Sequence, residues 1–160
     1  MVIKHASRTY IAALTAVETA CFPPAEAATE KEFIDRVQYY GNHFWLLYEG
    51  DKLLAFVDGF VTDEPDLTDD MYENAALHNE NGAWQMIFGV VTHPDYQHQG
   101  CAERLLRYVV EQARAQGRKG LVLTCKEHLL HFYGKVGFVD EGISDSTHGG
   151  VVWHKMRLTF

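Results

Sequence analysis

The stretch that most constrains this sequence runs from Trp84 to Gly117 and combines an apolar segment, a small-residue loop and an amphipathic segment. The apolar residues 84–92 predict a buried strand. From Leu105 onward, apolar residues recur with the 3.6-residue helical period, and Gly117 is placed to end that helix. The loop between them, residues 97–102, leads directly into the helix. A helix that starts this way points unpaired backbone N–H groups at one spot, which predicts an anion site.

The length and composition indicate one globular domain, residues 1–160. The chain is 47% hydrophobic and 22% charged, which is ordinary for a folded protein with a sizeable core. The net charge of −8 argues against nucleic acid as a main partner. The start has no apolar leader and no run is long enough to span a bilayer, so we expect a cytoplasmic protein without membrane contact. Three cysteines without metal-type spacing agree with a reducing compartment, and a homodimer is left open.

The remaining periodicities predict a mixed α/β chain. Further strands are predicted at residues 2–5, 43–48, 52–61, 120–124, 138–141 and 151–158, and further helices at residues 8–19, 29–40 and 127–135. Thr29 with Glu32 fits a capping box at the start of one helix. The strand–helix–strand unit from 84 to 124 predicts a right-handed parallel crossover. We therefore expect an α+β fold with a mixed, mostly antiparallel sheet and helices on both faces.

Two motifs carry a resemblance to a known family. His93-Pro94, Tyr96 and Gln97-x-x-Gly100-x-Ala102 resemble the acyl-CoA pyrophosphate loop of the GNAT superfamily of N-acetyltransferases. The segment F-Y-G-K-V-G-F at 132–138 is similar to the second half of that family. Within it, CFPPAEAATEKEF and TCKEHLLHFYGKVGF resemble the arylalkylamine (serotonin) N-acetyltransferases and their bacterial relatives. The resemblance implies a GNAT fold and acetyl-CoA as co-substrate.

The resemblance also implies where acetyl-CoA binds. The pantetheine would lie where the strands 84–92 and 121–124 diverge, and it would pair with exposed main-chain groups. Small residues at 100 and 102 would let a phosphate approach the backbone. The implied cofactor-binding residues are Val90, Val91, Thr92, Gln97, His98, Gln99, Gly100, Cys101, Ala102 and Glu103.

Amine acetylation needs an uncharged amine, stabilisation of the developing oxyanion and protonation of the leaving thiolate. Tyr133 matches the family position whose hydroxyl protonates the sulfur, and core packing is its alternative role. The two family histidines fall on Met86 and Phe88, which cannot accept a proton. Asp58, which interrupts an apolar strand, His148 in a polar loop, or water remain as the base.

An acidic stretch between residues 63 and 80 contains no Lys or Arg. Its seven acids are Asp63, Glu64, Asp66, Asp69, Asp70, Glu73 and Glu80. The other 15 acids of the chain nearly balance its 14 bases, so the acidity is local. The stretch is either a solvated loop or a rim that concentrates cationic amines.

The favoured function is an acetyl-CoA-dependent N-acetyltransferase that acts on a primary amine of a small molecule or on an amino terminus. Phe22, Trp84, Met86 and Phe88 are the expected amine-contacting residues. The alternative is a non-catalytic acyl-CoA-binding module, which the loss of both family histidines favours and the intact Tyr133 motif opposes. No histidine spacing matches a metal motif, and no metal is expected.

Overall fold

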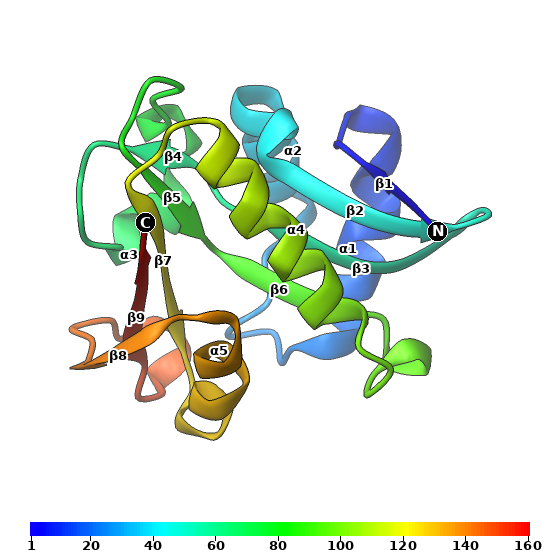
Figure 1. The fold of residues 1–160 in the computed structure, drawn as a ribbon. Coiled ribbons are helices and arrows are strands. Elements are labelled where there is room, and N and C mark those ends of the chain that lie inside the picture. The colour runs from blue at the N-terminus through cyan, green and yellow to red at the C-terminus, as the bar shows by residue number, and fades with distance from the viewer.

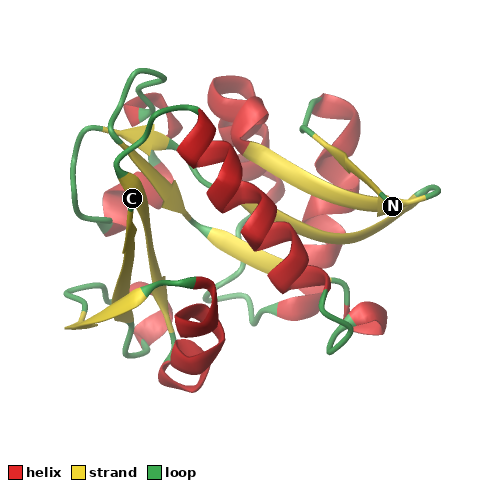
Figure 2. Cartoon of the chain, in the orientation of Figure 1, coloured by secondary structure: helices red, strands yellow, loops and turns green.

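The computed structural model describes residues 1–160 and contains two sheets that meet where two strands change partners (Figures 1 and 2). The strands are β1 (Val2–Lys4), β2 (Phe44–Glu49), β3 (Lys52–Asp58), β4 (Val61–Thr62), β5 (Trp84–Ile87), β6 (Gly89–Thr92), β7 (Gly120–Cys125), β8 (Val139–Ile143) and β9 (His154–Thr159). One sheet has the order β1-β2-β3-β6, and the other has the order β4-β5-β7-β9-β8. Only β5 and β7 are parallel, so the expected mixed sheet with one parallel crossover is confirmed.

The helices lie on both faces of the sheets. They are α1 (Ile11–Cys21), α2 (Glu30–Tyr40), α3 (Asp69–Glu73), α4 (Cys101–Ala115) and α5 (Leu130–Val136). In Figure 1, α4 crosses in front of β2, β3 and β6, while α1 and α2 lie behind them. Strand β2 shows how the sequence supports both layers: Phe44, Leu46 and Tyr48 pack into one core cluster. Trp45 and Leu47 pack into the other.

Two strands that the sequence predicts as continuous are divided. The predicted strand 84–92 breaks at Phe88, because β5 pairs with β7 as far as Ile87 and β6 pairs with β3. The predicted strand 52–61 breaks at Gly59, and β4 leaves β3 to join the second sheet. Periodicity does not detect these breaks, because the residues on either side of each are equally apolar.

The two breaks meet in one crossing. The backbone N–H of Met86 donates to Phe60 O at 2.8 Å, and the N–H of Phe88 donates to Asp58 O at 2.7 Å. A Cβ atom placed on Gly59 would lie 1.8 Å from Met86 O. Glycine is therefore required here by the close approach of two backbones.

The predicted helix starts are confirmed where local side chains decide them. The Thr29 hydroxyl accepts from Glu32 N–H at 3.2 Å, and Glu32 Oε1 accepts from Thr29 N–H at 3.2 Å, so the capping box is formed. The predicted helix 8–19 begins instead with a 3₁₀ turn at Arg8–Tyr10. The predicted helix 127–135 likewise begins with a 3₁₀ turn at Glu127–Leu129. Such turns are common at helix ends.

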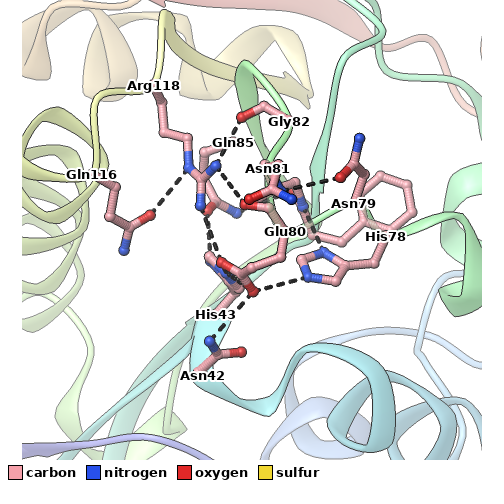
Figure 3. Close-up of polar contacts among 12 residues, drawn as sticks. Asn42, His43, His78, Asn79, Glu80, Asn81, Gly82, Gln85, Gln116 and Arg118 are labelled. Atoms are coloured by element: carbon pink, nitrogen blue, oxygen red, sulfur yellow. Dashed lines mark hydrogen bonds and ion pairs between the residues drawn. The ribbon is translucent and has the colours of Figure 1, made fainter.

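The acidic stretch is an ordered segment. It contains α3 and a 3₁₀ turn at Ala75–Leu77, and its far end is held by Glu80 (Figure 3). Glu80 Oε2 lies 2.9 Å from His43 Nε2 and 3.1 Å from Arg118 Nη2. Although burial raises the pKa of Glu80, the hydrogen bonds and charge of His43 outweigh it and hold that pKa at about 2.

His43, His78 and Glu80 bring three possible metal-ligand atoms within 4.8 Å of one another. The hydrogen bonds assign them another task. Nδ1 of His78 accepts the N–H of Val61 at 3.0 Å, so the ring proton of the neutral histidine is on Nε2. Nε2 points at Glu80 Oε1, 3.2 Å away, and donates to it. A nitrogen that carries this proton offers no lone pair to a cation. The three side chains therefore form a hydrogen-bonded cluster that holds the segment in place.

The backbone crossing gives a stability prediction. Gly59→Ala should lower the free energy of unfolding by about 1–3 kcal/mol, because the new methyl group forces Met86 away from β3 and β4. Gly134→Ala is the matched control, since no atom lies within 4 Å of a Cβ at that helical position. The control should stabilise by about 0.5–1 kcal/mol. Equal effects of the two substitutions in urea unfolding would contradict the crossing as the cause.

Candidate functional site

A cleft of about 510 Å³ opens where β6 and β7 diverge. It is bounded by the α1–α2 connection, the ends of β3 and β7, α3, and the connection between β8 and β9. The residues used below that line it are Glu18, Cys21, Phe22, Glu26, Glu32, Arg36, Asp58, Tyr72, Glu73, Phe88, Gly89, Val90, Thr124, Cys125, Lys126, Tyr133 and His148. The cleft therefore collects residues that are far apart in the sequence.

The loop before α4 has the geometry of an anion site. Gly100 is the residue before the helix and has a φ of +83°, and His98 has a φ of +62°. The first bond of the helix is Arg104 N–H to Gly100 O, and the backbone N–H groups from 97 to 103 have no acceptor in the protein. A row of unpaired donors at the positive end of a fifteen-residue helix suits a phosphate group. These residues fit the pyrophosphate contact that the sequence implied.

Strand β6 supplies the second part of a cofactor site. It is the edge of its sheet, so the side that faces away from β3 pairs with no strand. Val90 lines the cleft on that edge. Val91 packs its side chain into the core, and the carbonyl of Thr92 already accepts from the Cys21 thiol at 3.1 Å. Of the three strand residues that the sequence singled out, Val90 is thus the one that faces the cleft.

Tyr133 lies on α5 and lines the same cleft. Its side chain is buried, and its hydroxyl has no hydrogen-bond partner in the protein. Burial raises the pKa of this hydroxyl well above its usual value, and the neighbouring Cys125 and Tyr72 add to the effect. The hydroxyl therefore keeps its proton and can donate it to a group in the cleft.

Asp58 is not a free carboxylate. Its Oδ2 lies 3.2 Å from Arg36 Nη1, and both side chains are buried. Burial raises the pKa of Asp58 to about 6, although Arg36 works in the opposite direction. Arg36 also donates to the backbone oxygen of Tyr72 at 3.2 Å. The ion pair joins α2 to β3, and the bond to Tyr72 joins α2 to α3. These contacts hold together three elements that line the cleft.

His148 is held in one orientation rather than on a loose surface loop. Its Nε2–H donates to the backbone oxygen of Glu26 at 3.1 Å, and its ring stacks on Tyr72 with centroids 5.6 Å apart. Asp69 ties the loop down by accepting from the Ser146 hydroxyl and from the N–H of Thr147. The Nδ1 atom of His148 has no partner. A neutral ring in this tautomer keeps a lone pair on Nδ1.

The four expected amine-contacting residues divide into two that line the cleft and two that lie outside its lining. Phe22 and Phe88 line the cleft, but Trp84 and Met86 do not. Met86 is fully buried in the core beneath β5, and the Trp84 ring packs under the guanidinium of Arg157 at 4.7 Å. The break in the strand is the reason: β5 pairs with β7 as far as Ile87, and Phe88, just after the break, lines the cleft.

Sequence reasoning missed Glu18. It is buried, its Oε2 accepts the N–H of Ala28 at 2.9 Å, and no basic side chain pairs with it. Burial raises its pKa to about 7, and the nearby carboxylates of Asp58 and Glu32 act in the same direction. A signal was present, because Glu18 follows Leu14 by four residues on the apolar face of a helix.

The cleft is negative, but not for the reason that the sequence suggested. Two of the seven acids of the 63–80 stretch form ion pairs outside the cleft. Asp66 pairs with Lys155 at 2.7 Å and Arg157 at 2.9 Å, and Glu80 pairs with Arg118 at 3.1 Å. Only Glu73 of that stretch lines the cleft. The lining instead combines five carboxylates, Glu18, Glu26, Glu32, Asp58 and Glu73, with the two cationic side chains Arg36 and Lys126. The negative charge of the lining thus comes mainly from residues outside the acidic stretch.

The shifted pKa of Glu18 predicts a pH effect on stability. Because its pKa rises from 4.5 to about 7 on folding, the folded state binds the proton more tightly. This contribution favours folding at low pH and is lost as the pH rises from about 4.5 to about 7. Glu18→Gln keeps an acceptor for Ala28 and removes the titration, so it should stabilise by up to about 3 kcal/mol above pH 7.

The measurement is urea unfolding of both proteins at acid and alkaline pH. Below the usual carboxyl range the two free energies should converge. Glu30→Gln, on the exposed first turn of α2, makes the same chemical change outside the cleft and should show no such pH trend. A stability difference that stays constant with pH would contradict the raised pKa.

Comparison with known proteins agrees with this geometry. A sequence profile of the acetyltransferase (GNAT) family matches residues 11–138. Serotonin N-acetyltransferase of Mesocricetus auratus is 28% identical over 113 residues, which are 70% of this chain and 53% of that protein. The match thus spans about half of that relative's length.

Solved structures share the fold over almost the whole chain. The GphF GNAT-like decarboxylase, solved with isobutyryl-CoA, has a TM-score of 0.86 at 19% identity and covers 99% of both chains. The ribosomal-protein-S18-alanine N-acetyltransferase from Escherichia coli has a TM-score of 0.70 at 20% identity, covering 99% of this chain and 92% of that one. No helix of the structure is both long and apolar enough to cross a membrane.

Proposed function

Because the chain belongs to the acetyltransferase (GNAT) family, we propose that it transfers the acetyl group of acetyl-CoA to a primary amine, on a cationic small molecule or an amino terminus. The observation that carries the proposal is the row of unpaired N–H groups before α4. This row follows β6 in the chain, and β6 and Tyr133 both line the cleft. The anion site would bind the pyrophosphate, and the β6 edge would pair with the amides of the pantetheine.

The charge of the cleft supports an amine as the acceptor. Lys126 pairs with Glu26 at 2.7 Å, and Arg36 pairs with Asp58, so the remaining charge of the lining is negative. Such a lining attracts a protonated amine and repels a carboxylate. This favours acetyl transfer to an amine over a decarboxylation, the activity in the name of the GphF structure.

Tyr133 is the proposed acid, and three groups qualify as the acceptor of the amine proton. The tyrosine would give its proton to the leaving sulfur, for which a buried and protonated hydroxyl is suited. Asp58, His148 and Glu18 all line the cleft. A cytoplasmic location belongs to the same proposal, since Cys21, Cys101 and Cys125 are all free thiols.

The cofactor assignment is tested at Ala102, a half-buried residue in the first turn of α4. Ala102→Glu suits a helix start, so the fold should survive, but its carboxylate would occupy and repel the anion site. We expect acetyl-CoA affinity to fall by on the order of 10²-fold in titration calorimetry. Ala102→Gln has nearly the same size without the charge and should lose much less. Equal losses in both variants would leave only steric blocking as an explanation.

The transfer itself is tested by CoA release with acetyl-CoA and three amines: tryptamine, spermidine and an alanine-starting peptide. Tyr133→Phe keeps the ring and removes the hydroxyl, so the fold should stay intact while turnover falls by on the order of 10²-fold. Binding of acetyl-CoA without release of CoA by any amine would identify a non-catalytic acyl-CoA-binding module. Wild-type turnover in Tyr133→Phe would show that the hydroxyl is not the acid and that Tyr133 only packs in the core.

A further inference from the structure

Glu18 is a buried carboxyl group for which the fold provides one hydrogen bond and no counter-ion. Glu18 is 7% exposed and lines the cleft. Oε2 accepts the N–H of Ala28, while Oε1 has no partner. Buried carboxyls are normally paired with a base or fully hydrogen-bonded, because the charged form loses its hydration. An isolated one in the wall of a cleft therefore suggests a ligand that supplies the missing partner.

Glu18 lines the cleft from α1, which packs against β6. One turn later on α1, the thiol of Cys21 donates to the backbone oxygen of Thr92, so this end of α1 is fixed against β6. The carboxylate of Asp58 lies against the same strand, since a Cβ on Gly89 would be 2.9 Å from Asp58 Oδ1. Glu18 thus lines the same cleft as Phe22, Phe88 and the β6 edge where the pantetheine would lie.

We propose that Glu18 binds the ammonium group of the acceptor and takes its proton before the amine attacks the thioester. The proposal rests on the function proposed above. A carboxylate and an ammonium attract each other as the substrate enters, and the proton then passes along their hydrogen bond. That transfer turns two charged groups into two neutral ones, which a buried and poorly hydrated site favours.

Glu18 is better suited to this step than either alternative. Burial also raises the pKa of Asp58, to about 6, but Oδ2 of Asp58 is already paired with Arg36, whose charge partly opposes that rise. A neutral His148 ring offers no negative charge to attract a cation, and taking the proton would only move the positive charge to that ring. The remaining charged groups that act on Glu18 are Asp58, Glu32 and Arg36, and its raised pKa of about 7 matches a base that works near neutral pH.

The protons balance over the reaction. The ammonium group gives one proton to Glu18, and the resulting amine forms the C–N bond as the C–S bond breaks. After the C–N bond forms, the nitrogen carries one proton more than it does in the amide product. The departing thiolate sulfur needs one proton. Tyr133 supplies the sulfur with its hydroxyl proton and is reprotonated at the expense of the nitrogen. Glu18 releases its proton to solvent, so the net products are the amide, CoA with a thiol, and one proton.

The test compares two variants that separate a base from a structural acceptor. Glu18→Gln keeps an oxygen for the Ala28 N–H but cannot take a proton. Glu18→Asp keeps a carboxylate but withdraws it by one methylene from Ala28. Glu30→Gln is the control for loss of one negative charge, because Glu30 lies outside the cleft. The measurement is kcat/KM for the best amine of the panel between about pH 5 and pH 9, with acetyl-CoA affinity measured in parallel.

For wild type and Glu30→Gln, we expect kcat/KM to rise with pH through an inflection near the pKa of Glu18. Glu18→Gln should lose this inflection and fall by on the order of 10²-fold with acetyl-CoA affinity unchanged. Glu18→Asp should keep the inflection and exceed Glu18→Gln in rate. If Glu18→Gln fails to fold, retention of the inflection in Glu18→Asp still supports the proposal and its loss overturns it.

The opposite order overturns the proposal. If Glu18→Gln retains the wild-type rate and inflection while Glu18→Asp is impaired, then Glu18 only holds Ala28 in place. That result leaves the proposed function intact, because the wild type still acetylates the amine. Absence of CoA release by the wild type with every amine is a different outcome, which overturns the proposed function and this inference with it.

Discussion

The structure depends on one close approach of two backbones, where Gly59 passes Met86. At this point β3 gives way to β4 and β5 gives way to β6, and each strand changes its partner. Hydrogen bonds from Met86 N–H to Phe60 O and from Phe88 N–H to Asp58 O connect the two strands at the exchange. Because β6 pairs with β3 whereas β5 pairs with β7, the two sheets separate beyond Ile87. The cleft is the direct consequence of that separation.

The same exchange decides the chemistry of the cleft. It places Asp58 at the end of β3, in a buried position that requires a counter-ion, and α2 supplies Arg36. Glu18, on α1, lines the same cleft, but Arg36 is already paired with Asp58. Glu18 therefore has no basic side chain as a partner. An unpaired buried carboxyl costs stability at neutral pH, as its raised pKa implies. Such a cost is typical of residues that are kept for binding or catalysis.

The acidic segment shows how charge that is concentrated in the sequence can be dispersed in the fold. Glu80 contacts His43, His78 and Arg118, and Asp66 contacts Lys155 and Arg157. These contacts anchor both ends of the segment on the second sheet and its neighbours. Between them, α3 presents Tyr72 to the cleft, where Tyr72 stacks on His148 and its hydroxyl lies 3.1 Å from Thr124 Oγ1. The segment therefore contributes to the site mainly by position.

The sequence by itself determined the features that depend on residues close together in the chain. The loop 97–102 and the helix after it were predictable, because unpaired N–H groups follow from any helix start and glycine suits the positive φ at position 100. The capping box of Thr29 and Glu32 is equally local. Only the tertiary structure decided which strand each segment pairs with, and therefore that Phe88 faces the cleft while Met86 does not. It also decided which acids lie unpaired, since burial and counter-ions come from residues far away in the sequence, as Glu18 and Arg36 show.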